Sequence, residues 1–129
     1  MGVDRGRAWS WYLAYKGQSG QWAQLLHRVT GLGVALFLLL HIVDTALLGW
    51  GPAVFDAVSA FWSQPLFLVL EVMLAGAVIY HAVNGIRVTI IDFWDLGSLY
   101  QERLFWATIA ISLLLFVPAA AGILSNLFR

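Results

Sequence analysis

A histidine in the second half of the chain stands between two small residues at helical spacing. Ala77 lies four residues before His81 and Gly85 lies four residues after it, so a helix would place all three on one stripe. A flat macrocycle standing on this imidazole would need such clearance, and neutral imidazole is a good axial ligand for haem iron. Small residues also let two helices approach closely, with a histidine bonding across their interface. The spacing is therefore compatible with a haem ligand and with a packing stripe.

A second polar string, His27-Arg28-Val29-Thr30-Gly31, opens the first long apolar stretch. A fixed cation beside a hydroxyl or an imidazole suits a quinone, because the cation stabilises negative charge on the carbonyl oxygens and the other groups relay protons. The other interpretation makes Arg28 a positive anchor at the membrane edge, with the Thr30 hydroxyl bonded back to its own helix. We also expect Gly31 and Gly33 to let another helix or a ring come close.

Further ionisable residues fall within the apolar stretches. His41 follows His27 by fourteen residues, which is roughly 21 Å along a helix, and Asp44 lies one turn beyond it. We expect a polar contact between His41 and Asp44, with ligation of a second haem by His41 as the main rival. Glu71, and with it Asp44, is a candidate for a proton path, or a protonated acid bonded to another helix. Arg87 either snorkels to the interface or pairs with a haem propionate.

The composition places these residues in a membrane protein. The chain has 129 residues, of which 61% are hydrophobic and 11% are charged, whereas soluble domains have about 25% charged residues. Seven Lys and Arg balance seven Asp and Glu, so no bulk basic surface is available for nucleic acid. The absence of cysteine excludes disulfides, thiolate metal sites and iron–sulfur ligation by this chain. Three histidines remain as the strong candidates for binding a transition metal.

Three stretches have the length of a membrane-spanning helix, which needs about 20 mostly apolar residues. They run over about residues 29–50, 65–91 and 104–124. The runs are too long and too continuous for alternating strands, so we predict an all-α integral membrane protein that forms one domain over residues 1–129. The turn around Gly51 is expected to end the first helix, and Pro65 is expected to begin the second. Residues 51–62 predict a short interfacial helix.

The basic residues predict the orientation in the membrane. Those on or before the first span, and those after the second, are Arg5, Arg7, Lys16, Arg28, Arg87 and Arg103. The connection over 49–64 has no Lys or Arg, and Arg129 alone contradicts the bias. We therefore expect the N-terminus on the cytoplasmic side. Residues 1–23 lack the apolar core of a signal peptide, and we interpret them as an interfacial segment. Its aromatic residues, which suit the headgroup zone or a partner's surface, are Trp9, Trp11, Tyr12, Tyr15 and Trp22.

Together the two polar strings resemble the cytochrome b membrane-anchor subunit of succinate dehydrogenase, the larger of its two anchor subunits. In that family a His-Arg-x-Ser/Thr-Gly string opens the first helix, and a His-x-x-x-Gly-Ile-Arg string ends the second. An acid follows near the membrane edge, and here it is Asp92. The resemblance covers about residues 24–95 and the plan of three spans. It implies a subunit of complex II within a heteromeric helix bundle, without catalytic activity of its own.

The resemblance implies a haem site around the second string. His81 matches the axial ligand of haem b, and the opposite ligand comes from the second anchor subunit. Many relatives have a histidine near a propionate immediately after Gly-Ile-Arg, where this chain has Val88. His41 resembles the first-helix histidine of relatives with two haems. One haem b is therefore expected, with a second as the alternative.

The resemblance also implies a quinone site around the first string. Arg28 matches an arginine of that site, and His27 stands next to it. Gln24 occupies a position where the family often has a serine in the quinone pocket, and its amide can still donate or accept a hydrogen bond. Thr30 completes the set of candidate quinone-binding residues. The substrate would be menaquinone or ubiquinone.

The implied partners are a second anchor subunit, an iron–sulfur subunit and a flavoprotein subunit. The chain is expected to cross the cell membrane several times, in contact with lipid. The iron–sulfur and flavoprotein subunits are expected on the cytoplasmic side. The direction, succinate oxidation or fumarate reduction, stays open. A haem-free structural anchor is an alternative function. A stand-alone b-type cytochrome or haem transporter is a third, but His81 and His41 are expected at different depths and would pair poorly across one haem.

Overall fold

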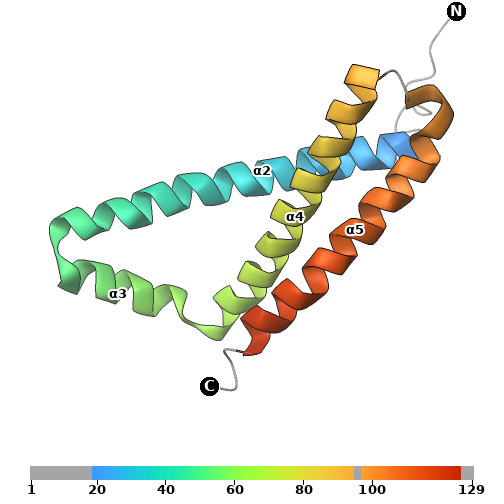
Figure 1. Ribbon diagram of the computed structural model, residues 1–129. Coiled ribbons are helices and arrows are strands. Elements are labelled where there is room, and N and C mark those ends of the chain that lie inside the picture. Colours follow the sequence, from blue (N-terminus) through green and yellow to red (C-terminus); the bar gives the residue numbers. More distant parts are fainter. Residues whose placement is uncertain (1–18, 95–96, 126–129) are drawn as a thin grey trace, which may run out of the picture.

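The computed structural model describes residues 19–94 and 97–125, and almost all of them are helical (Figure 1). The elements are α2 (Ser19–Ala46), the 3-10 turn η1 (Leu47–Trp50), α3 (Pro52–Trp62), α4 (Pro65–Trp94) and α5 (Gly97–Ser125). Three helical stretches, over 19–50, 65–94 and 100–125, are long and apolar enough to cross a membrane. The chain is an all-α integral membrane protein with the three spans that the sequence predicts.

Helix α2 begins well before the first apolar stretch. It starts at Ser19, so Arg28 lies nine residues, roughly 13 Å, inside the helix rather than at its end. Between Gly20 and Arg28 the sequence has no residue that breaks a helix. The prediction that the first string opens the helix is therefore wrong. Of the N-terminal aromatic residues only Trp22 is described, whereas Arg5, Arg7, Lys16 and Arg129 lie outside the described residues.

The connection between α2 and α3 follows the turn signals of the sequence. Gly51 has φ of 106°, a left-handed conformation that glycine adopts without steric cost. Its N–H donates to the Leu48 carbonyl at 3.2 Å, which closes the 3-10 turn. Pro52 then occupies the first turn of α3, where its missing N–H costs nothing. The predicted helix over 51–62 is confirmed as α3, and Pro65 begins α4 as predicted.

The three long helices α2, α4 and α5 come together at one end only. Helices α4 and α5 run side by side, and the first turns of α2 cross them, whereas α2 and α4 diverge toward α3 (Figure 1). We call the region of residues 20–31, 80–87 and 101 the crossing end, and the region between α2, α3 and the start of α4 the open end. Small residues allow the α4–α5 contact, since a Cβ on Gly76 would lie 3.2 Å from the ring of Phe116.

Few side chains are buried, and most of those are polar. The most apolar window of α2 has no buried residue, and 34 large apolar side chains of the described residues are exposed. Because leaving such a side chain in water costs about 1.5–3 kcal/mol, lipid or other subunits must cover this surface. Apart from Thr108 and Ser112 on α5, the buried side chains lie at the crossing end; they are Ala23, Tyr80, Asn84 and Arg87.

Candidate functional site

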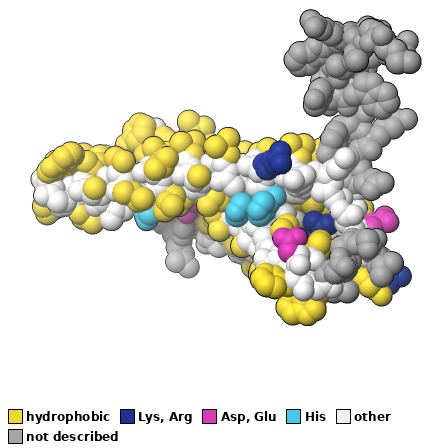
Figure 2. All heavy atoms as spheres, turned by 90° about the horizontal axis from the view of Figure 1, so that it is seen from above, with side chains coloured by type: hydrophobic (Ala, Val, Ile, Leu, Met, Phe, Trp, Pro, Cys, Tyr) yellow, Lys and Arg dark blue, Asp and Glu magenta, His cyan; other side chains and the backbone are white. Residues whose placement is uncertain are grey.

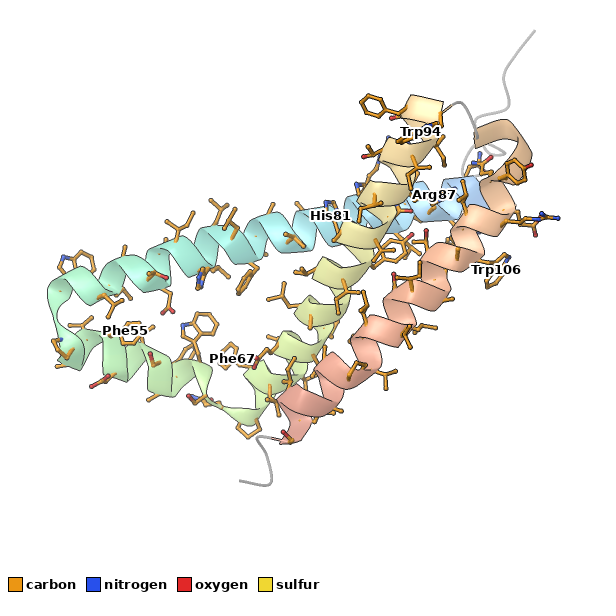
Figure 3. All side chains as sticks on the ribbon, in the orientation of Figure 1. Phe55, Phe67, His81, Arg87, Trp94 and Trp106 are labelled. Atoms are coloured by element: carbon orange, nitrogen blue, oxygen red, sulfur yellow. The ribbon has the colours of Figure 1, made fainter. Side chains whose placement is uncertain are left out.

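His81 lies where α4 crosses α2 (Figure 3), and its ring is bonded to the backbone of α2. Its Nδ1 is 3.1 Å from the main-chain oxygen of His27. A carbonyl oxygen only accepts hydrogen bonds, so Nδ1 carries the proton and donates it. The neutral ring then has its lone pair on Nε2, which has no hydrogen bond and is not among the buried unpaired atoms of the described residues. His81 therefore has the tautomer and the backbone support typical of a metal-ligating imidazole.

Gly31 allows His81 to reach α2. A Cβ at this position would lie 2.8 Å from Cε1 and 3.2 Å from Nδ1 of His81, too close for either atom to stay in place. A Cβ on Gly33 would have no neighbour within 4 Å among the described residues. The predicted close approach of a ring is thus confirmed at Gly31, whereas at Gly33, where no described atom occupies the space, it stays a prediction.

The ring of His27 stacks on the ring of His81. Their centroids are 4.0 Å apart and their planes differ by 12°. Cε1 of His27 also lies 3.7 Å from the place of a Cβ on Gly85. The space beside Gly85, which the sequence suggested for a macrocycle, therefore admits an imidazole from α2. Among the residues that the structure describes, Nδ1 of His27 is buried without a hydrogen-bond partner, so the crossing end contains a buried polar atom whose hydrogen bond is not made.

Thr30 lies on the side of α2 that faces α4. Its Oγ1 is 2.7 Å from the Leu26 carbonyl and 3.1 Å from the His27 carbonyl, so the predicted bond back to the helix is confirmed. The same oxygen is 3.5 Å from Nδ1 of His81. The Thr30 hydroxyl is therefore part of the hydrogen-bond environment of His81.

Arg28 and Gln24 lie on a different face of α2. Both side chains are exposed, and their spacing of four residues places them on one stripe of the helix. In the view of Figure 2, a basic side chain and histidine side chains gather near the crossing of the helices, whereas hydrophobic side chains cover much of the rest of α2. The structure therefore separates the candidate quinone residues. His27 and Thr30 contact α4, while Arg28 and Gln24 remain open to another subunit or to lipid.

Arg87 is buried, with 6% of its surface exposed. Its guanidinium donates to Oδ1 of Asn84 at 3.4 Å and to the main-chain oxygen of Gln101 at 3.5 Å. Because α4 continues to Trp94 and α5 returns alongside it, α5 covers this position (Figure 3). The snorkelling interpretation is therefore wrong. Arg87 lies at the contact between α4 and α5, and its Nε has no partner among the described residues.

Two further residues of the crossing end were missed by the sequence reasoning. The Tyr80 hydroxyl donates to the Ala23 carbonyl at 3.3 Å, which ties α4 to α2. Asn84 is fully buried, and its Nδ2 has no hydrogen-bond partner within 19–94 and 97–125. The signal was present, because Tyr80, Asn84 and Arg87 are spaced four and three residues apart and share one helix face.

The open end contains a pocket of about 510 Å³ that brings together His41, Asp44 and Glu71. It is lined by Gly33, Leu36, Phe37, Leu40, His41, Asp44, Ser59, Trp62, Phe67, Leu70, Glu71 and Leu74. Asp44 accepts a hydrogen bond from Nε1 of Trp62 at 3.2 Å, while His41 stacks on Phe37 with ring centroids 5.4 Å apart. The predicted contact between His41 and Asp44 is therefore wrong, because α3 brings an indole donor to the carboxylate. Among the described residues no three His, Asp or Glu side chains are grouped to hold a metal ion.

Comparison with known proteins agrees with this architecture. Residues 7–118 match the family described as the Succinate dehydrogenase/Fumarate reductase transmembrane subunit. The chain is 41% identical over 105 residues to the Succinate dehydrogenase 2 membrane subunit SdhC of Mycobacterium tuberculosis, covering 81% of this chain and 77% of that protein. It is 27% identical over 111 residues to the Succinate dehydrogenase hydrophobic membrane anchor subunit of Halobacterium salinarum, covering 85% of each. The chain, with its three spanning helices and its histidine-bearing crossing end, thus belongs to the succinate dehydrogenase/fumarate reductase transmembrane subunit family.

Proposed function

We propose that this chain is the cytochrome b anchor subunit of a succinate dehydrogenase, that His81 is an axial ligand of haem b, and that α2 forms part of a quinone site. The hydrogen bond from Nδ1 of His81 to the His27 carbonyl carries this proposal, because it leaves Nε2 with a free lone pair. Family membership supports the respiratory role, and the bond supports the ligand.

The second axial ligand would come from another subunit. His27 is stacked on His81 with centroids 4.0 Å apart, which leaves no room for an iron ion between the two rings. His41 lies fourteen residues along α2 at the open end. A bound haem would supply a one-electron carrier. The chain itself fixes the ligand tautomer and gives the ring its orientation.

The exposed stripe of Gln24 and Arg28 is the proposed contribution to quinone binding. A guanidinium stabilises the negative charge that develops on a quinone oxygen during reduction, and an amide can hydrogen-bond a second oxygen. His27 borders this stripe, and its buried Nδ1 has no hydrogen-bond partner in the described part of the chain. Because the stripe is exposed in this chain, a neighbouring subunit must complete the pocket. Menaquinone and ubiquinone both fit this chemistry.

The crossing end is proposed to face the cytoplasm, where the iron–sulfur and flavoprotein subunits would bind. Arg28, Arg87 and Arg103 lie toward this end, and residues 29–86 contain no Lys or Arg. Cytoplasmic ends of membrane helices carry such an excess of basic residues. Electrons would then enter the membrane beside the haem ligand and the quinone stripe. Fumarate reduction would use the same residues in reverse.

A haem-free structural anchor is the second candidate, and one observation favours it. The His27 ring fills the space beside Gly85, which is a packing solution that needs no macrocycle. A reduced-minus-oxidised optical spectrum of the purified complex, with haem quantified per flavin, decides between the two. One haem supports the cytochrome b role, none supports the structural anchor, and two would make His41 the candidate ligand of the second haem.

Arg28→Ala is expected to lower succinate:quinone reductase activity about a hundred- to thousandfold, because a charged donor to the reacting oxygen is lost. Succinate oxidation with a water-soluble artificial acceptor, which bypasses the quinone, should stay unchanged. Arg103→Ala is the matched control, since it removes an exposed arginine of α5 at the same end of the bundle. Equal loss of both activities in Arg28→Ala would instead indicate a role in assembly.

A further inference from the structure

We propose that Thr30 is a positioning residue for His81 and does not contact quinone. This inference rests on the proposed haem ligation by His81, and it assigns Thr30 a different role from the one that the family resemblance suggests. It starts from the distances around Nδ1 of His81, which faces two oxygen atoms of α2. These are the His27 carbonyl at 3.1 Å and the Thr30 hydroxyl at 3.5 Å.

The Thr30 hydroxyl has the capacity to act as an acceptor here. A hydroxyl carries one proton and two lone pairs. The closest acceptor for that proton is the Leu26 carbonyl at 2.7 Å, so the lone pairs remain for the N–H of His81. The His27 carbonyl can in turn accept both the N–H of Gly31 within the helix and the N–H of His81, because it has two lone pairs. Thr30 thus offers Nδ1–H of His81 a second acceptor beside the main-chain oxygen of His27.

The position of Thr30 argues against a contact with quinone. It is half-buried on the side of α2 that faces α4, and its hydroxyl is already bonded within its own helix. Arg28 and Gln24, which carry the proposed quinone stripe, lie on another, exposed face of α2. A quinone bound to that stripe would have to pass around the helix to reach Thr30.

The proposed role of Thr30 has a consequence for the midpoint potential of a haem bound to His81. A hydrogen bond accepted from Nδ1–H makes an imidazole more basic and fixes its orientation. A more basic axial ligand stabilises ferric relative to ferrous iron. Loss of the Thr30 oxygen weakens the acceptor environment of Nδ1, so the midpoint potential of the haem is expected to become more positive.

The test is a redox titration of the purified complex carrying Thr30→Val, which keeps the β-branched shape and removes the hydroxyl. We expect a positive shift of the haem midpoint potential, with haem content and the KM for quinone unchanged. Thr30→Ser should restore the original potential because it restores the oxygen. Thr45→Val is the matched control, since Thr45 bonds back to the His41 carbonyl at 2.7 Å on the same helix, at the open end.

Several outcomes would overturn the inference. A higher KM for quinone at an unchanged potential would assign Thr30 to the quinone site. An equal shift in Thr30→Val and Thr45→Val, or no shift in either, would show that the hydroxyl does not act on His81. Failure of the underlying ligation is recognised separately, because His81→Ala would then retain its haem. If His81→Ala loses haem while Thr30→Val leaves the potential in place, only the role of Thr30 is wrong.

Discussion

His81→Ala is expected to abolish the haem b absorption of the purified complex. The substitution removes the imidazole whose Nδ1 is bonded to the His27 carbonyl and whose Nε2 has no hydrogen bond to any described residue. Methyl in place of imidazole leaves no ligand atom at this point of α4. The measurement is a reduced-minus-oxidised spectrum normalised to flavin.

The matched variant for this experiment is His41→Ala, which removes an imidazole from the pocket at the open end. It should leave the haem content unchanged if one haem is present, and should lower it by half if His41 binds a second. Unchanged haem in His81→Ala would refute the ligand assignment. Co-purification of the flavoprotein with both variants shows that the complex has assembled and that the spectra are comparable.

Gly31→Ala is expected to separate His81 from its main-chain partner. The new Cβ would lie 2.8 Å from Cε1 and 3.2 Å from Nδ1 of His81, so the ring must shift, and a shift of Nδ1 away from α2 weakens its bond to the His27 carbonyl. Overpacking of this kind costs about 1–3 kcal/mol, while alanine in place of glycine favours a helix by about 0.5–1 kcal/mol. We therefore expect a net loss of thermal stability of the complex and a perturbed or absent haem spectrum.

Gly33→Ala provides the control, because it lies two residues away on α2 and its Cβ would meet no described atom within 4 Å. It receives the same gain in helix propensity without the clash, so it should be neutral or slightly stabilising. The difference between the two melting temperatures then isolates the contact with His81. Identical behaviour of the two variants would mean that His81 does not lie against Gly31 in the assembled complex.

The crossing end also explains how the three long helices are held together although most of the buried side chains among the described residues are polar. Tyr80, Asn84 and Arg87 are buried from the same face of α4, and their bonds reach α2 through the Ala23 carbonyl and α5 through the Gln101 carbonyl. In lipid, the hydrophobic effect contributes little to helix association. Packing of small residues and interhelical hydrogen bonds stabilise it instead. The polar face of α4 therefore holds the three helices together where the histidines lie.

Much of the architecture could be predicted from the sequence, because it depends on interactions between residues that are close together along the chain. The spans followed from the length of the apolar runs, and the turn at Gly51 and the start at Pro65 followed from residues that act on their own backbone. The placement of His81 and His27 at one end and of His41 and Glu71 at the other also followed, because position along a helix is fixed by a constant rise per residue.

The tertiary structure alone decided which side chains meet. For Arg87 the sequence left open snorkelling to the membrane surface and pairing with a haem propionate, and the return of α5 buries it. Asp44 was expected to bond His41, but α3 offers the indole of Trp62. Helical spacing places residues on a stripe, but the crossing of α2 and α4 determines what that stripe touches. This crossing selected Gly31 over Gly33 as the point of close approach and placed the His27 carbonyl at Nδ1 of His81. The sequence by itself thus determined the candidate ligand and its depth, whereas the packing of separate helices determined the hydrogen bond that prepares it.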